Sequence, residues 1–360
     1  MMWNTAKYFA HLTRALCKEP FFIRSERACL FVTLVVFCFI NAAAAWSQTE
    51  DKQLIEGAKK EGKLVWYATM AIDGAKPLLD AFVKEYPFIK AELVRLGGST
   101  HLMARTMTET RAGHWLFDVT QGTSMPLLIK QNIMAPYLSP ERDVFISEYK
   151  DSKGFWTGIY VTNLVLMYNT SLVAQRDIPK DYNDLLDQKW KGKMMMEPSD
   201  YDWYGTLVTI WGQKRANDYM HQLARQEPTW RNGHGLIPRL VAAGESPLGW
   251  AFNYRVELMK KQGAPVDWVD TFNPIFAEVN GIGLSAKPAN PNAAKLFINF
   301  ALSKRGQGIV RDMQRVPARS DVKPVAGKMD QSRLHLKATP EEVILNLDRY
   351  AQEFRKIFGL

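Results

Sequence analysis

The residues that carry chemistry in this 360-residue chain do not gather into a catalytic motif. The segment GAKKEGK at Gly57–Lys63 fits the first seven positions of a phosphate-binding P-loop, but Leu64 stands where a serine or threonine would hold Mg²⁺. The segment also runs from a predicted helix into a predicted strand, which is the reverse of the order that a P-loop needs. HExxH and GxSxG motifs are absent, and the histidines and carboxylates form no suggestive pair in the sequence. The sequence therefore favours a binding protein over an enzyme, and it predicts no catalytic residue and no cofactor.

Polar side chains occur in the loops that follow predicted strands in the first part of the chain. Three such loops, Thr69–Asp73, Gly97–Thr100 and Gln121–Ser124, each lead into a predicted helix. Ligands of open parallel sheets gather at the carboxyl ends of the strands, and the helix N-termini found there offer free N–H groups. We select four side chains from these loops as candidates for ligand binding: Thr69, Ser99, Thr123 and Ser124. Thr123 and Ser124 fit equally well as helix caps.

Two later loops combine hydroxyl, aromatic and glycine residues. Glu197–Trp203 reads EPSDYDW between a predicted strand and a predicted helix, and Arg231–Gly235 reads RNGHG before another helix. The glycines allow close approach of the backbone, and the amides at the helix start point outward. Further candidates for ligand binding from these loops are Ser199, Tyr201, Asn232 and His234. Plain helix caps in the first loop, and a turn without a ligand in the second, are the alternatives.

These residues need a frame of strands and helices, and the sequence predicts one from Lys63 onward. Short apolar runs alternate with segments whose apolar residues recur every three or four positions. In chain order we predict strand 63–68, helix 74–86, strand 89–96, helix 99–111, strand 116–119 and helix 124–131. That order implies a mostly parallel sheet with helices on both faces.

A second series follows the long apolar run Gly158–Asn169, which has a polar Thr162-Asn163 in its middle. We predict helix 181–190, strand 193–197, helical segment 204–227, helix 236–243, strand 247–252 and a return crossing 272–283. Asn290 and Ser303 are predicted to cap the next two helices, and a capping box at Thr339–Glu342 precedes the last one. The predicted parts are a first lobe (46–160), a second lobe (161–275), a return to the first lobe (276–325) and a C-terminal extension with a helix (326–360).

The segment GIGLSAKPANPNAAKLFINFALSKRGQ at Gly281–Gln307 resembles the extracellular solute-binding proteins of ABC importers, in the branch that contains the iron(III)-binding proteins. KGKMMMEPSDYDWYG and AAGE…GAPVDW add to the resemblance, which covers roughly Leu54–Val322. It implies a two-lobed α/β fold of the type II periplasmic-binding-protein kind, in which each lobe is a mostly parallel sheet flanked by helices and the ligand cleft lies between the lobes. It also implies a small-molecule solute, a permease partner in the inner membrane and closure of the lobes on the ligand. Members of the family place the loop of Ser199 and Tyr201 on the cleft.

The run Asn253-Tyr254-Arg255 separates this sequence from the iron binders that it resembles. Those proteins carry Asn-Tyr-Tyr here, and phenolate oxygens suit Fe³⁺. The arginine repels a cation and fits a carboxylate or phosphate, and the loop Thr69–Asp73 lacks the histidine found in several iron binders. We therefore add Tyr254 and Arg255 to the candidates, predict no metal ligand, and expect an organic anion or a metal chelate as the solute. An Arg255 that faces solvent or a structural carboxylate, such as Glu257 or Glu245, is the alternative.

The N-terminal segment has the pattern of an export signal. A basic region precedes the apolar run of residues 29–40, and Asn41–Trp46 supplies small residues for cleavage. We expect a signal peptide, 1–45, cleaved near Ala45, and a periplasmic protein without cysteine, since all three cysteines precede that site. A membrane-tethered sensor module that keeps this segment, and a secreted cleft enzyme, are the rival interpretations.

The charge of the chain indicates no large polyanionic partner. The formal net charge is +9, but no Lys/Arg-rich run or basic–aromatic ribbon supports nucleic-acid binding. The resemblance to the solute-binding proteins implies a small solute and a permease as partners, and we expect the protein to be a monomer.

Overall fold

The computed structural model describes residues 52–325 and 333–360. The predicted signal peptide, 1–45, lies outside these residues. Ala58–Leu360 forms one compact unit, and the elements below belong to it. Within the described part of the chain, no helix has both the length and the apolar character needed to cross a lipid bilayer.

A single mixed β-sheet runs through this unit. Its main path is β2 (Lys90–Arg95), β1 (Lys63–Ala68), β3 (Val119–Gly122), β10 (Ile275–Ser285), β5 (Thr157–Asn169), β8 (Leu248–Phe252), β6 (Met194–Met196) and β7 (Thr229–Trp230). Shorter strands pair beside it: β4 (Met134–Ala135), β9 (Val266–Trp268), β11 (Val316–Pro317) and β12 (Leu336–Ala338). Pairing is parallel between β1, β2 and β3 and between β6, β7 and β8, as the strand–helix alternation predicts. It is antiparallel where β10 and β5 meet each other and their main neighbours, β3 and β8.

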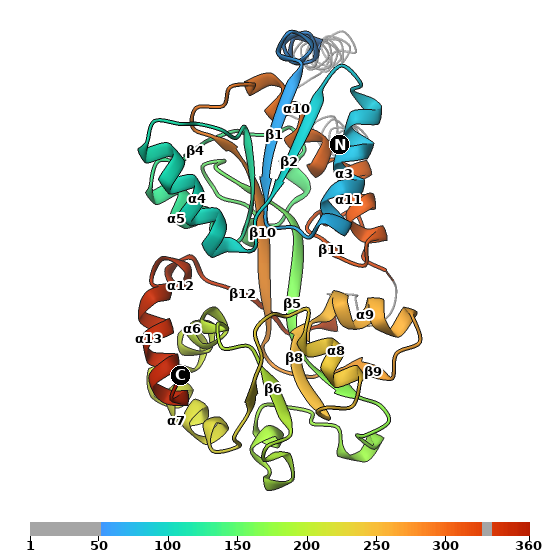
Figure 1. Ribbon diagram of the computed structural model, residues 1–360, viewed down its shortest axis with the longest axis vertical. Helices are drawn as coiled ribbons and strands as arrows, with labels where there is room; N and C mark the ends of the chain where they lie inside the picture. Colours follow the sequence, from blue (N-terminus) through green and yellow to red (C-terminus); the bar gives the residue numbers. More distant parts are fainter. Residues whose placement is uncertain (1–51, 326–332) are drawn as a thin grey trace, which may run out of the picture. The chain divides into compact units, whose positions relative to one another are not determined.

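The long strands β5 and β10 join the two halves of the sheet (Figure 1). All thirteen residues of β5 are buried, which explains why its sequence is mostly apolar. The two strands pair from Phe276↔Leu164 to Ile282↔Thr157, with a register shift between Asn280 and Gly281. We call the part with β1–β4 the first half and the part with β6–β9 the second half.

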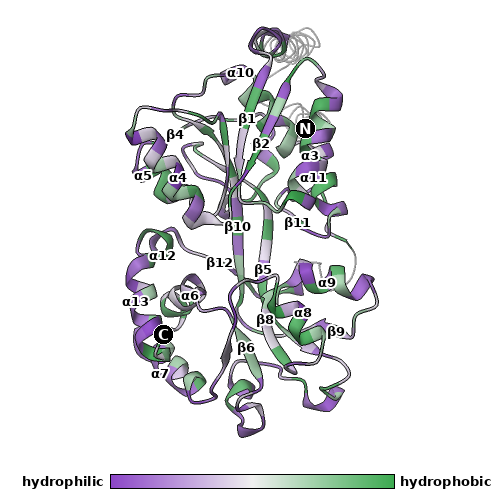
Figure 2. Ribbon diagram, in the orientation of Figure 1, coloured by the Kyte–Doolittle hydropathy of each residue, from purple (hydrophilic) through white to green (hydrophobic). Residues whose placement is uncertain are grey.

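Helices cover both halves of the sheet. In the first half they are α3 (Ile72–Glu85), α4 (Ser99–Arg111), α5 (Met125–Lys130), α10 (Pro291–Leu302) and α11 (Lys304–Asp312). In the second half they are α6 (Tyr201–Trp211), α7 (Gln213–Ala224), α8 (Ile237–Ala242) and α9 (Asn253–Lys261). The chain ends in α12 (Glu341–Leu345) and α13 (Leu347–Phe358). Figure 2 shows hydrophobic residues along β6 and β8 and a hydrophilic stretch in the middle of β10.

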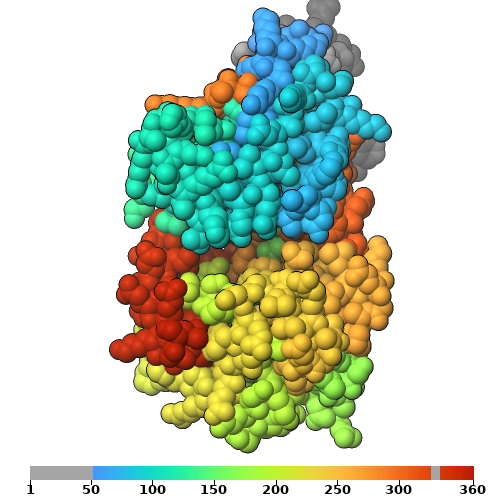
Figure 3. Space-filling view, viewed as in Figure 1, coloured from blue at the N-terminus to red at the C-terminus, as the bar shows by residue number. Residues whose placement is uncertain are grey.

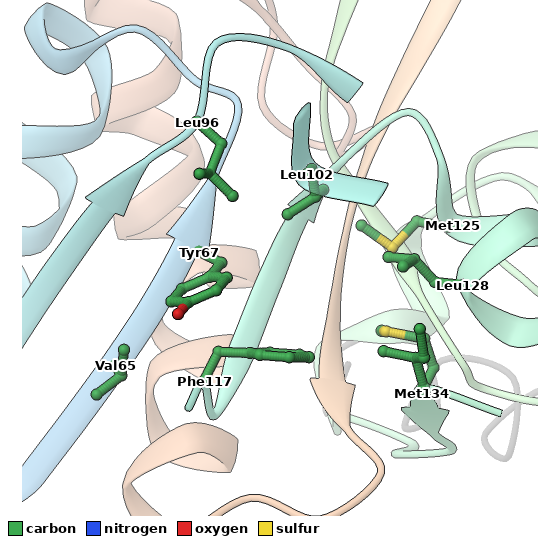
Figure 4. Close-up of a cluster of buried hydrophobic side chains, with 9 residues drawn as sticks. Val65, Tyr67, Leu96, Leu102, Phe117, Met125, Leu128 and Met134 are labelled. Carbon is green, nitrogen blue, oxygen red and sulfur yellow. The ribbon is translucent and has the colours of Figure 1, made fainter. Parts of the chain in front are cut away.

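The core of the first half lies between β1, β3 and the helices α4 and α5. Val65, Tyr67, Leu102, Phe117 and Met125 are among its buried side chains (Figure 4). The rings of Tyr67 and Phe117 stack with their centroids 5.0 Å apart. Full burial of each such side chain stabilises the fold by about 1.5–3 kcal/mol. Four tryptophans are also fully buried, Trp66 in the first half and Trp203, Trp250 and Trp268 in the second.

Two predicted helices of the second half differ from the structure. Segment 181–190 forms two 3-10 turns, Asn183–Leu186 and Gln188–Trp190, because the Asp187 carboxylate between them accepts a hydrogen bond from the Lys189 N–H and turns the chain there. The predicted helical segment 204–227 is two helices, α6 and α7, since Gly212 has a φ of 79° and interrupts the helical path. The predicted strand 116–119 is also displaced, to Val119–Gly122.

Of three predicted helix caps, Ser303 is observed, and Asn290 and Thr339 are not. Ser303 caps α11, and its hydroxyl accepts a hydrogen bond from the Gly306 N–H at 3.1 Å. Asn290 does not cap α10, because its backbone and side-chain N–H groups donate to the Asp118 carboxylate instead. Thr339 also caps nothing: its hydroxyl is buried without a partner, and α12 starts after Pro340 without a side-chain cap.

Candidate functional site

A cleft separates the two halves on the face shown in Figure 3. Residues of the first half, coloured blue to teal, stand on one side of a hollow, and residues of the second half, coloured yellow to gold, stand on the other. Darker green and brown residues, the colours of β5 and β10, lie at its floor. The candidate residues are described by their position relative to β5 and β10.

The four candidates of the first half lie together at the ends of β1 and β3 and the start of α4. The Ser99 and Thr123 hydroxyl oxygens are 2.6 Å apart, and the Ser124 hydroxyl donates to the Ser99 carbonyl at 3.3 Å. The Thr69 side chain lies beside Gly122, where an added Cβ would be only 3.2 Å from the Thr69 methyl group. Ser124 makes no side-chain cap to α5. The structure thus brings Ser99, Thr123 and Ser124 into one hydroxyl cluster, and it places Thr69 beside Gly122, which precedes Thr123 in the chain.

Gln121 connects the hydroxyl cluster to the floor of the cleft. Its side-chain oxygen accepts from the Met70 N–H at 2.9 Å. Its side-chain nitrogen donates to the Tyr160 hydroxyl on β5 at 3.3 Å and to the Asn280 side-chain oxygen on β10 at 3.2 Å. The end of β3 is thereby fixed to both long strands.

Arg315 is the most unusual charged residue of the site. Only 5% of its surface is exposed, and its guanidinium carbon lies 4.4 Å from the ring centroid of Tyr160 and 4.3 Å from that of Tyr254. Tyr254 is its side-chain hydrogen-bond partner, and Asp73 acts on it electrostatically without forming an ion pair. No carboxylate in residues 52–325 or 333–360 lies within ion-pair distance of it. The aromatic faces cover the guanidinium, but its planar set of N–H donors lacks an anionic acceptor among the described residues.

Tyr254 and Arg255 occupy the other side of Arg315, at the start of α9. Tyr254 is buried, and the Arg255 guanidinium carbon lies 5.3 Å from its ring centroid. That carbon would also lie 3.9 Å from a Cβ added to Gly235, in the predicted binding loop. Neither Glu257 nor Glu245, the carboxylates considered from the sequence, forms an ion pair with Arg255 in the described structure. Burial raises the pKa of Tyr160, the second ring around Arg315, to about 12, so its hydroxyl stays neutral at physiological pH.

The second-half loops converge on an acidic end of the cleft. Glu197 accepts a hydrogen bond from the Ser199 hydroxyl at 3.0 Å and another from the Gly233 N–H. His234 Nε2 lies 3.0 Å from Asp200 Oδ1, while its Nδ1 is buried without a partner. Asn232, next to these residues, is exposed, and its side chain makes no hydrogen bond to another described residue that would fix it in the site.

The ionisation of this acidic end is strongly perturbed. Burial, followed by the charge of the neighbouring Asp200, raises the pKa of Asp202 to about 6. Burial, followed by the charge of Asp202, raises the pKa of Glu278 well above its usual range. Burial opposes protonation of His234, but the charge and hydrogen bond of Asp200 outweigh it and raise the pKa of His234 to about 9. Like charges in a shared, partly dehydrated space produce this pattern.

A continuous row of rings links the acidic end to Arg315. The His234 ring centroid lies 4.4 Å from that of Phe252, and Phe252 stacks on Tyr254 with centroids 6.3 Å apart. Tyr254 in turn lies against Arg315. The acidic end and the buried cation therefore belong to one site.

Tyr201 is a candidate that the structure places elsewhere. Its hydroxyl accepts a hydrogen bond from the Arg355 guanidinium at 2.7 Å, and its ring lies edge-on to Phe354 at 5.7 Å. Both partners are on α13. The side chain is thus engaged by the C-terminal helix and does not join the other candidates.

Several residues of the site were not selected from the sequence: Gln121, Tyr160, Asp200, Asp202, Glu278, Asn280 and Arg315. The sequence could have indicated two of them. Glu278 and Asn280 alternate with apolar residues in β10 and therefore share one face of the strand. For Arg315 there was no such indication, since a single arginine before a short strand is common. Within the described residues, no group of three or more His, Cys, Asp or Glu side chains is arranged to hold a metal ion.

Known proteins share this fold. Iron-bound HitA from Pseudomonas aeruginosa superposes with a TM-score of 0.73 at 20% identity, covering 83% of this chain and 99% of that one. The periplasmic binding protein AfuA from Actinobacillus pleuropneumoniae, solved with exogenous fructose-6-phosphate, superposes with a TM-score of 0.71 at 24% identity over the same shares. These similarities confirm the predicted two-lobed α/β fold.

Curated relatives match most of the chain. An uncharacterised protein of Haemophilus influenzae is 28% identical over 268 residues, which are 69% of this chain and 75% of that protein. The Fe(3+)-binding periplasmic protein of Serratia marcescens is 24% identical over 267 residues, which are 71% of this chain and 78% of that protein.

The family profile described as bacterial extracellular solute-binding protein matches residues 118–336, which is more than half of the chain. Its members are solute-binding components of ABC import systems rather than enzymes. The family resemblance noted in the sequence is confirmed. The chain belongs to the bacterial extracellular solute-binding protein family.

Proposed function

We propose that this protein captures a small anionic solute, either a free organic anion or a metal chelate, in the periplasm and delivers it to an ABC permease of the inner membrane. The observation that carries the proposal is Arg315, a buried guanidinium held between two tyrosine rings without a carboxylate partner among the described residues. Removal of a charge from water is costly unless an opposite charge replaces the lost hydration. A bound anion supplies that charge.

The same geometry argues against capture of bare Fe³⁺. Tyr254, the match to the first tyrosine of the iron-binding motif, has the Arg315 guanidinium 4.3 Å and the Arg255 guanidinium 5.3 Å from its ring centroid. Two positive charges beside one phenol oppose the binding of a trivalent cation. The Serratia marcescens relative is named for Fe(3+), and another structure of this fold holds iron and citrate. These names make ferric citrate and fructose-6-phosphate useful test compounds.

The proposed mechanism is closure of two lobes. We assign residues 46–160 and 276–325 to the first lobe, 161–275 to the second, and 326–360 to a C-terminal extension. An anion on Arg315 would meet the hydroxyl cluster of Ser99 and Thr123 from the first lobe and the Tyr254-Arg255 pair from the second. Contacts from both lobes shift the population towards the closed form, which the permease then recognises. We propose that the protein acts as a monomer after cleavage near Ala45, and N-terminal sequencing of the exported protein distinguishes cleavage from a retained anchor.

The test is a thermal-shift and calorimetric screen of the purified protein. The panel contains inorganic phosphate, organophosphates, carboxylic acids, ferric citrate and Fe³⁺ alone. A compound at 1,000 times its Kd stabilises the protein by about 4 kcal/mol, which moves the midpoint by several degrees. Arg315→Gln should lower the affinity for the anion by about 30-fold or more, which is the effect expected when one buried charged contact is lost.

Arg311→Gln is the matched control, because Arg311 lies a few residues earlier, near the end of α11, is only partly buried and is paired with Asp312. It should bind the anion as the parent protein does. A stabilising shift with Fe³⁺ alone, or an anion that binds Arg315→Gln and the parent equally, would contradict the proposal. The unliganded melting curve of each variant shows whether it has folded.

A further inference from the structure

The floor of the cleft presents two chemically different ends on one face of the paired strands. Tyr160 on β5 is opposite Asn280 on β10, and two residues further along Thr162 is opposite Glu278. Because side chains alternate between the faces of a strand, these four residues share a face. A step of two residues places the two pairs about 7 Å apart along the strands.

The first pair belongs to the basic end. Arg315 lies over the Tyr160 ring, and Gln121 donates hydrogen bonds to both Tyr160 and Asn280. The groups at this end are one buried cation and neutral hydrogen-bonding side chains. It fits the anionic group of the solute on which the proposed function rests.

The second pair opens the acidic end. Thr162 is hydrogen-bonded to Glu278, and the charges of Asp202, Asp200 and His234 act on Glu278. Glu197 completes a set of four carboxylates. In residues 52–325 and 333–360 the ion pair of His234 with Asp200 is the only one made by any member of this set. The carboxylate oxygens of the acidic end can therefore accept more hydrogen bonds than the described donors of the chain supply.

Two independent observations indicate that a ligand spans both ends. Arg315 is a nine-tenths buried cation without an anionic partner in the described residues, and it borders the acidic end through Tyr254 and Phe252. The carboxylates beside it are half-buried or buried, yet none reaches its guanidinium. A molecule that joins an anion to hydrogen-bond donors satisfies both groups at once.

We propose that the solute is two-ended, with an anionic group on Arg315 and, about 7 Å along the cleft floor, hydroxyl or ammonium groups that donate hydrogen bonds to Glu278 and Asp202. A second anionic group at that position would meet like charges, which disfavour binding. A simple oxyanion would leave the acidic end unfilled. The site should therefore select a solute with one anionic group and a hydroxyl or ammonium group at its other end over a solute of the same length with an anionic group at each end.

The experiment compares matched pairs of probes by calorimetry. Sorbitol 6-phosphate and 6-phosphogluconate differ at the far end by a hydroxyl against a carboxylate, and 4-aminobutyl phosphate and butyl phosphate differ by an ammonium. We expect at least one donor-ended probe to bind ten-fold or more tightly than its partner, the difference of a single good polar contact. The pair that shows the larger ratio identifies the hydroxyl or the ammonium as the donor.

Variants test whether the ratio of affinities within a probe pair depends on the acidic end. Glu278→Gln should reduce the ratio between the probes of that pair at least three-fold, whereas Glu245→Gln, an exposed carboxylate change, should leave it unchanged. Arg315→Gln should weaken the binding of every anionic probe. Equal affinities within both pairs, together with dependence on Arg315, would overturn the two-ended solute and leave anion capture intact. Absence of any anion binding would overturn both. Where Glu278→Gln fails to fold, Asp202→Asn takes its place in the comparison.

Discussion

Replacing Asp202 with asparagine should stabilise the ligand-free protein at neutral pH. The carboxyl lies at the start of α6, where burial and the charge of Asp200 raise its pKa from 3.8 to about 6. A folded-state pKa above the unfolded value means that the native state binds the proton more tightly. The stabilising contribution of the protonated group is complete below pH 4 and is lost as the pH rises to about 6.

The size of the effect follows from the shift in pKa. A difference of about two units corresponds to about 3 kcal/mol between acid and neutral pH. Asp202 is half-buried rather than fully enclosed, so solvent screening reduces this and we expect about 1–3 kcal/mol. Asparagine has no charge to bury, and its side-chain oxygen can still accept the hydrogen bond that the Trp203 N–H donates to Asp202 at 3.0 Å. Removal of the charge also lowers the pKa of Glu278, which acts in the same direction.

The assay is urea unfolding followed by tryptophan fluorescence at pH 4.5 and 7.5. Asp202→Asn should be more stable than the parent protein at pH 7.5, and the difference should shrink at pH 4.5. Asp80→Asn is the control, because Asp80 is exposed on α3 beside Lys76 and should change the stability by less than about 0.5 kcal/mol at either pH. A variant that is less stable than the parent at pH 7.5, or a difference that does not change with pH, would refute the electrostatic account of the acidic end.

Two further predictions concern packing and capping. Gly205→Ala should destabilise the protein by about 1–3 kcal/mol in thermal unfolding, because the added Cβ would lie 2.6 Å from a Val343 methyl carbon and 2.9 Å from the Tyr350 ring; unchanged stability would show that the C-terminal helices move aside without cost. Ser303→Ala should cost about 1 kcal/mol by removing the side-chain cap of α11, whereas Ser303→Asp, which keeps an acceptor, should cost less; equal losses in the two variants would show that the cap contributes nothing.

The fold could largely be predicted from the sequence because its signals are local. The apolar periodicity of β1, α4 and β5 depends on each segment alone, and their predicted bounds lie within one residue of the observed ones. The errors arise where one residue redirects the chain. Asp187 and Gly212 each interrupt a segment whose composition alone permits a longer helix.

The site could be predicted only in part because its central group is assembled from distant segments. The hydroxyl cluster was accessible from the sequence, since parallel strands bring their following loops to one edge. Arg315 meets Tyr160 across 155 positions and Tyr254 across 61, by the residue numbers. Nothing local in the sequence reports such a contact. Tyr201 is the opposite case. Its local sequence predicts a side chain available to a ligand, but a helix more than 140 residues later contacts that side chain instead.

The path of β10 also has a consequence for how the protein is made. β3 pairs with β1 on one side and with β10, at Gly281–Leu284, on the other. During synthesis the first half therefore has an unpaired strand edge until the ribosome has released more than 280 residues. Loop closure over such a span is slow compared with local folding. We expect the nascent chain to stay incompletely folded throughout most of its translation, with the first half and the crossing strands completing their structure together and late.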